Sequence, residues 1–152
     1  MTLYFAYGSN MSRTLMRLLC PGAEALGRAR LQGWRFRITS RGYASIASKP
    51  GSVVHGVLWR LSPRDRAVLD AYEDVDSGFY RRRMLPVRYG ARNVSALVYV
   101  GHDRGEGWPN PAYQKIVLGA ASDWKLPQRY VREIARRLPY RSGRAENTRE
   151  RA

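Results

Sequence analysis

The chain is short of cysteine, histidine, lysine and long apolar runs. Its single cysteine, Cys20, excludes an internal disulfide and has no partners at metal-ligand spacing. The two histidines, His55 and His102, lie far apart without a serine–aspartate framework, so neither a zinc site nor a Ser-His-Asp triad is expected. No run is apolar enough to cross a bilayer, and residues 1–5 form no export leader. We therefore expect a cytoplasmic protein without membrane contact.

Glycine-rich phosphate loops are missing too, since neither GxGxxG nor a P-loop occurs. The sequence thus offers no metal or cofactor site, and none is expected. Acidic residues are few, which gives a net charge of +15 and an isoelectric point near 10.9. A polyanionic partner would account for this surplus of positive charge. A GC-rich genome would account for it as well, because 24 of the 27 basic residues are arginine. The charges are spread from Arg13 to Arg151, which favours composition and argues against nucleic acid.

Strand signals dominate the first two-thirds of the chain and helices gather at its end, which predicts an α+β fold on a mainly antiparallel or mixed sheet. Strands are expected at 3–7, 34–38, 45–47, 53–61, 80–89 and 94–100, with a turn at 49–52. Helices are expected at 11–19, 62–73 and 112–121, and from Pro127 onward. We expect one domain over residues 1–139 and a basic, disordered tail over 140–152.

Two of these helices have specific signals. In the first, an apolar face is predicted from helical spacing at Met11, Leu15, Leu18 and Leu19. In the second, Ser62 is the expected N-cap, and the proline that follows it is suited to the first helical position.

Residues 4–10, Tyr-Phe-Ala-Tyr-Gly-Ser-Asn, run from the first strand towards a helix. Such a junction leaves backbone N–H groups without helical partners, and together with the helix dipole they favour an anion. A carboxylate or a developing oxyanion would suit this position. A plain strand–turn–helix connection explains the same pattern, and the segment alone does not decide between them.

Residues 70–80 combine acidic and aromatic side chains where the second helix ends. The negative end of the helix dipole disfavours a charged carboxylate at Glu73. Burial against Tyr72 or Tyr80 would disfavour it further and raise its pKa towards the range of a general base. Pairing with arginines at 81–83 is the alternative and is preferred for the three aspartates of the segment, which are Asp70, Asp74 and Asp76.

A third segment, residues 111–116, lies at the expected start of a helix. Tyr113 is a candidate for lining a pocket. An ordinary amphipathic helix start accounts for it equally well.

Together, the three segments resemble the γ-glutamylcyclotransferase family. Residues 4–10 are similar to its opening motif, and residues 69–80 resemble the segment that bears its catalytic glutamate. Residues 29–32 and 56–59 resemble the central strands of the family, and residues 111–127 resemble its C-terminal part. The similarity extends from about residue 3 to residue 139, nearly a whole domain. It implies a small mixed β-barrel with flanking helices, often as a homodimer.

The resemblance also implies a reaction. The α-amine of a γ-glutamyl substrate attacks its own γ-carbonyl and gives 5-oxoproline and a free amino acid or amine. By position, Glu73 is the implied general acid and base. The implied substrate-binding residues are Tyr7, Gly8, Ser9, Asn10, Tyr80 and Tyr113. Proximity is built into such a substrate, so a single carboxylate and a few backbone N–H donors suffice.

Asp74 departs from the family pattern, in which glycine is expected after the glutamate. Aspartate tolerates left-handed backbone better than most residues, so the turn is expected to persist. The additional carboxylate can change which leaving amine is accepted.

Two other functions remain open. The same chemistry would remove a γ-glutamyl protecting group from a secondary metabolite, or from an intermediate on an acidic carrier protein that suits the +15 charge. A basic nucleic-acid-binding domain without catalysis is the second, although Glu73 in its full local context speaks against it. The expected partners are therefore a small γ-glutamyl substrate, a second copy of the chain and, in one alternative, an acidic carrier.

Overall fold

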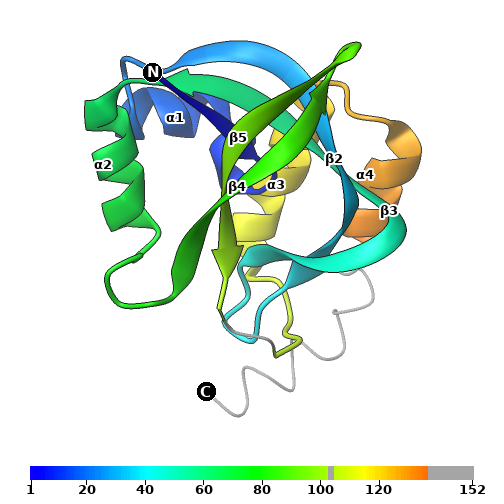
Figure 1. Ribbon diagram of the computed structural model, residues 1–152. Helices are drawn as coiled ribbons and strands as arrows, with labels where there is room; N and C mark the ends of the chain where they lie inside the picture. Colours follow the sequence, from blue (N-terminus) through cyan, green and yellow to red (C-terminus); the bar gives the residue numbers. More distant parts are fainter. Residues whose placement is uncertain (103–104, 137–152) are drawn as a thin grey trace.

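Five strands close into one barrel in the computed structural model, which describes residues 1–102 and 105–136 (Figure 1). Their order around the barrel is β1-β3-β2-β4-β5. β1 runs parallel to β5, and the other pairs are antiparallel. The bounds are Thr2–Ala6 for β1, Glu24–Ile38 for β2, Ala44–Leu61 for β3, Tyr80–Tyr89 for β4 and Arg92–Gly101 for β5. The predicted α+β fold with a small mixed barrel is confirmed. The predicted tail at 140–152 lies outside the described residues.

Helices flank this barrel, with α2 and α4 on opposite sides of it in Figure 1. Their bounds are Arg13–Leu19 for α1, Pro63–Tyr72 for α2, Pro111–Asp123 for α3 and Gln128–Ala135 for α4, and a short 3-10 helix, η1, spans Ser9–Met11. The predicted N-cap of α2 is confirmed, because Ser62 and Asp65 exchange two hydrogen bonds of 3.1 Å in a capping box. None of the described helices has both the length and the apolar character needed to span a membrane.

The structure corrects the predictions for β2 and β3. The strand predicted at 34–38 reaches back to Glu24, and the turn predicted at 49–52 lies inside β3. In the register of the pair, Gly33 alone of β2 stands opposite residues 49–52. The Lys-Pro-Gly-Ser signal therefore forms a bulge instead of reversing the chain, and Pro50, which has no N–H to pair, is tolerated at such a bulge.

The apolar face predicted for the first helix is wrong at one position. α1 begins at Arg13 and is capped by Ser12, whose hydroxyl accepts from the Leu15 N–H at 3.2 Å. With this start, Met16 is buried whereas Leu18 is 78% exposed. The helix is also shorter than the predicted 11–19, because Met11 belongs to the preceding 3-10 helix, and spacing alone did not fix how α1 is rotated on the barrel.

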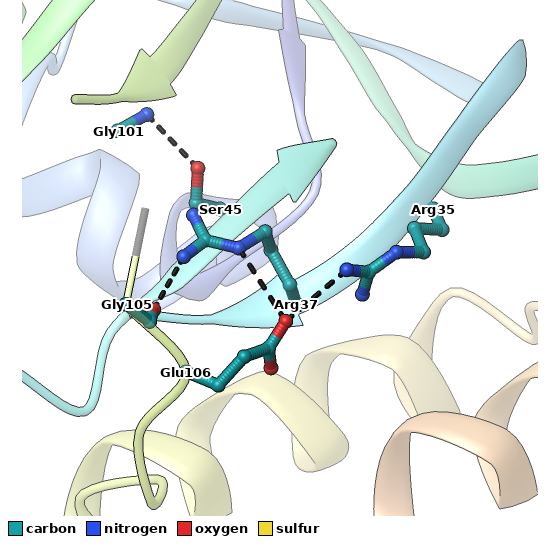
Figure 2. A network of polar contacts seen from close by, with 6 residues as sticks. All are labelled: Arg35, Arg37, Ser45, Gly101, Gly105 and Glu106. Atoms are coloured by element: carbon teal, nitrogen blue, oxygen red, sulfur yellow. Dashed lines mark hydrogen bonds and ion pairs between the residues drawn. The ribbon is translucent and has the colours of Figure 1, made fainter. Parts of the chain in front are cut away.

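One buried arginine fixes the chain that follows β5 (Figure 2). Arg37, on β2, is 4% exposed, donates to the Gly105 carbonyl and lies 3.9 Å from Glu106. Arg35 reaches the same carboxylate at 3.1 Å, as Figure 2 shows. Gly107 then packs against the end of β2 and donates to the Ile38 carbonyl at 3.1 Å. These contacts hold the segment next to the β2–β3 turn.

β1 approaches β3 so closely that only glycine fits at position 56. A Cβ atom on Gly56 would lie 2.3 Å from the Ala6 carbonyl oxygen and 2.9 Å from the ring of Phe5, which is fully buried. This contact fixes the position of the end of β1 against β3.

We expect Gly56→Ala to destabilise the fold by about 1–3 kcal/mol, because the added methyl group overpacks the β1–β3 contact. Gly119→Ala is the matched control, since a Cβ at this exposed site on α3 meets nothing within 4 Å. It should stabilise the fold by about 0.5–1 kcal/mol through helix propensity. Urea unfolding measures both, and a Gly56→Ala protein as stable as wild type would contradict this packing.

Candidate active site

A pocket of about 310 Å³ lies where β1 ends. All seven site residues predicted from the sequence line it: Tyr7, Gly8, Ser9, Asn10, Glu73, Tyr80 and Tyr113. Three further residues complete the wall, Tyr4, Ala44 and Tyr99, none of which is among the site residues predicted from the sequence. Tyr4 stands within the quoted opening motif, but the other two are brought in by strand register, for which the local sequence carries no signal. No three histidine, cysteine or acidic side chains among the described residues cluster as metal ligands.

Glu73 is placed by the way α2 ends. It is the C-cap of the helix, and the Val75 N–H donates back to the Asp70 carbonyl at 3.1 Å. The Asp74 N–H donates to the Ala71 carbonyl at 3.1 Å, which completes a Schellman motif. Asp74 occupies the left-handed position with φ of 51°, so aspartate keeps the turn, as expected, where the family pattern has glycine.

The carboxyl group of Glu73 is shifted towards neutrality. Burial is the larger cause and the negative charge of Asp74 the smaller, and together they raise the pKa of Glu73 from 4.5 to about 7. The Asn10 side-chain amide donates to Glu73 Oε1 at 3.4 Å. A carboxyl with this pKa is present in both protonation states near pH 7, so it can accept and return a proton.

Asn10 links this carboxyl to the barrel wall. Its Nδ2 also donates to the Tyr4 hydroxyl at 3.0 Å, and the residue is 3% exposed. Its Oδ1 has no hydrogen-bond partner among the described residues. Asn10, a residue of the pocket wall, therefore uses its amide N–H₂ group to join Tyr4 to Glu73.

Two backbone N–H groups converge on the hydroxyl of Tyr113. Ser9 donates to it at 3.4 Å and Ala44 at 3.3 Å. A Cβ on Gly8 would lie 2.6 Å from the same oxygen, so glycine allows this approach. The cradle predicted from residues 8–10 alone thus includes a donor from β3 and is directed at a tyrosine oxygen.

The other hydroxyl groups of the pocket are anchored to backbone carbonyls. Tyr80 donates to the Ala44 carbonyl and Tyr7 to the Tyr99 carbonyl, each at 2.6 Å. Tyr80 therefore donates to the backbone and not to Glu73. Burial is the main cause that raises the pKa of Tyr113 to about 12 and that of Tyr7 well above 10, so both stay protonated at neutral pH.

α2 is tied to the barrel by Asp70. The Tyr99 hydroxyl donates to Asp70 Oδ1 at 2.6 Å, and Arg82 Nη1 lies 3.0 Å from Oδ2. The predicted pairing of Asp70 with an arginine at 81–83 is confirmed. Within the described ranges Asp74 and Asp76 form no ion pair, so the same prediction is wrong for them. The tie holds Asp70 one turn before Glu73 and fixes where the helix ends.

We expect the Glu73 carboxyl to titrate with a midpoint near pH 7 in ¹³C NMR. Asp74→Asn removes a like charge and should lower this pKa, while burial keeps it above 4.5. Because the folded pKa is the raised one, the stability from protonated Glu73 is complete below about pH 4.5 and is lost as the pH rises through 7. Because Asp74→Asn lowers the folded pKa of Glu73, this stability should be lost at a lower pH in the variant than in wild type.

Asp76→Asn, at an exposed position in the same turn, is the matched control and should leave the midpoint unchanged. A wild-type midpoint near 4.5 would contradict the electrostatics described for this carboxyl.

Comparison with known proteins places this site in a family. Residues 4–126 match the family described as "Gamma-glutamyl cyclotransferase, AIG2-like". The γ-glutamylcyclotransferases of Mus musculus and Homo sapiens are each 30% identical to the chain over 145 residues, 87% of this chain and 76% of the relative. A solved γ-glutamyl cyclotransferase is similar with a TM-score of 0.82 and 29% identity, covering 88% of this chain and 85% of its own.

YkqA from Bacillus subtilis is similar as well, with a TM-score of 0.78 and 25% identity over 91% of this chain and 54% of its own. The family match covers every residue that lines the pocket, from Tyr4 to Tyr113. With so much of the sequence and of the barrel shared, the chain belongs to the γ-glutamyl cyclotransferase, AIG2-like family.

Proposed function

We propose that the chain is a γ-glutamylcyclotransferase that releases 5-oxoproline from a γ-glutamyl amide. The α-amine nitrogen of the substrate attacks its own γ-carbonyl carbon, which forms the ring C–N bond. The amide bond to the leaving amine then breaks. The observation that carries the proposal is the Glu73 carboxyl, with a pKa of about 7, in the wall of the pocket.

Glu73 moves the proton in this proposal. Its carboxylate accepts a proton from the attacking amine and passes it to the departing nitrogen, so no proton is consumed overall. A pKa near 7 suits both halves of that transfer, because neither protonation state is strongly preferred. The enzyme's remaining task is to fold the γ-glutamyl group so that amine and carbonyl meet.

The pocket supplies groups for each end of the γ-glutamyl moiety. The Glu73 carboxylate, to which the Asn10 amide donates, is the acceptor for the α-amine. Tyr113 is the proposed donor to the oxyanion that develops at the γ-carbonyl. Burial raises the pKa of Tyr113 to about 12, and the two backbone N–H bonds that its hydroxyl accepts oppose that rise and polarise its own O–H towards an oxyanion.

The origin of the attacking atom tests this function. In ¹⁸O-labelled water the released 5-oxoproline should contain no label, because water never enters the bond-breaking step. A substrate with an acetylated α-amine should be inert, since its nitrogen lone pair is withdrawn into an amide. Mass spectrometry of the first product measures both, and labelled glutamate would overturn the cyclotransferase proposal.

Glu73→Gln belongs in the same experiment and should lose about a hundredfold or more in turnover, because an amide cannot carry the proton. Its melting temperature should show an intact fold. Asp76→Asn should turn over like wild type.

A further inference from the structure

The pocket adjoins a larger outer chamber of about 980 Å³. The two cavities share Glu73 together with Ser9, Tyr80 and Tyr113, and the outer one is further lined by Thr39, Arg41, Tyr43, Tyr72, Asp74 and Phe79. Glu73 therefore stands where the two meet. If it returns a proton to the departing nitrogen, the γ-glutamyl group lies on the inner side and the leaving group on the outer side.

Arg41 places an unpaired positive charge in the outer chamber. Its guanidinium carbon lies 3.9 Å above the centroid of the Phe79 ring, which holds the group in place. Among residues 1–102 and 105–136, Arg41 forms no ion pair. A guanidinium held on a ring and lacking a counter-ion is suited to bind a carboxylate.

The turn that presents Arg41 is tightly built. The Thr39 N–H donates to the Tyr43 carbonyl at 2.8 Å, and the Asn110 N–H donates to the Gly42 carbonyl at 3.0 Å. Gly42 has φ of 91°, and a Cβ on it would lie 2.9 Å from the Trp108 carbonyl oxygen. The backbone of the turn is thus held against the segment that Arg37 anchors.

Two tyrosine rings form the exposed wall of the same chamber. Tyr43 is 43% exposed and Tyr72 is 46% exposed, although both are large aromatic residues. Tyr43 packs its ring edge-on against Tyr113 at 5.1 Å, so it is supported from the pocket side. Partly exposed rings around a cavity are suited to bury a flat apolar group.

We propose that the outer chamber is a leaving-group subsite for aromatic amino acids. Arg41 binds the carboxylate of the amino acid to be released, and Tyr43 and Tyr72 contact its ring. The amide C–N bond breaks, Glu73 gives its proton to that nitrogen, and the aromatic amino acid leaves with a free amine. Asp74 adds a negative charge to the chamber and disfavours leaving groups with a second carboxylate. This inference rests on the proposed function.

The test compares the kcat/KM of γ-glutamyl-phenylalanine, its C-terminal amide and γ-glutamyl-alanine, with 5-oxoproline as the readout. Wild type should prefer the phenylalanine acid over both others. Arg41→Gln should lower the preference for acid over amide about tenfold, the effect of one charge-assisted hydrogen bond. Arg41→Lys, which keeps the charge but loses the planar fork, should be intermediate.

Tyr72→Leu should lower the preference for phenylalanine over alanine several-fold. Arg92→Gln, an exposed arginine at the start of β5, is the control and should change neither ratio. If Arg41→Gln leaves the preference for acid over amide unchanged while 5-oxoproline is still formed, the subsite proposal is overturned and the cyclotransferase proposal stands.

Calorimetric titration with L-phenylalanine and L-phenylalaninamide tests the chamber without turnover. The acid should bind more tightly than the amide, and Arg41→Gln should reduce the difference. Equal binding of the two compounds by wild type would also overturn the subsite. A protein that discriminates the two ligands but forms 5-oxoproline from none of the substrates would support the chamber and refute the proposed reaction.

Discussion

Partial burial of the Glu73 carboxyl is the constraint on which the chemistry of this pocket depends. In water a glutamate is almost fully ionised at neutral pH, and the proton exchange proposed for Glu73 requires both of its forms. The fold withholds water from this side chain, and Asp74 adds a like charge beside it. The helix dipole acts in the same direction, because Glu73 ends α2.

The surrounding structure fixes this carboxyl in space. α2 is capped at its start by Ser62 and Asp65 and is tied near its end to Tyr99 through Asp70. β1 is held against β3 at the contact that only Gly56 allows, and η1, which follows β1, places the Asn10 amide beside Glu73. The pocket is therefore assembled from separate parts of the chain, each positioned by contacts that do not involve the reaction.

Local chemistry made some of this predictable from the sequence. The Ser62-Pro63 start of α2 is a short-range signal, and the structure has that cap. The seven candidate site residues could be grouped only by resemblance to a family, because nothing local connects residues 7–10 with Tyr113. Ala44 and Tyr99 were missed since strand register brings them to the pocket. The sequence at 49–52 predicts a turn where the structure has a bulge, because Pro and Gly occur in both.

The pH dependence of kcat/KM for a γ-glutamyl substrate tests most directly whether the buried carboxyl is the working base. The ionised form of Glu73 must be present to accept the first proton, so log kcat/KM should rise with unit slope and level off near pH 7. Asp74→Asn should move that break to lower pH, in step with the titration of the carboxyl itself. A break near pH 4.5, or one that Asp74→Asn leaves in place, would contradict the role given to Glu73.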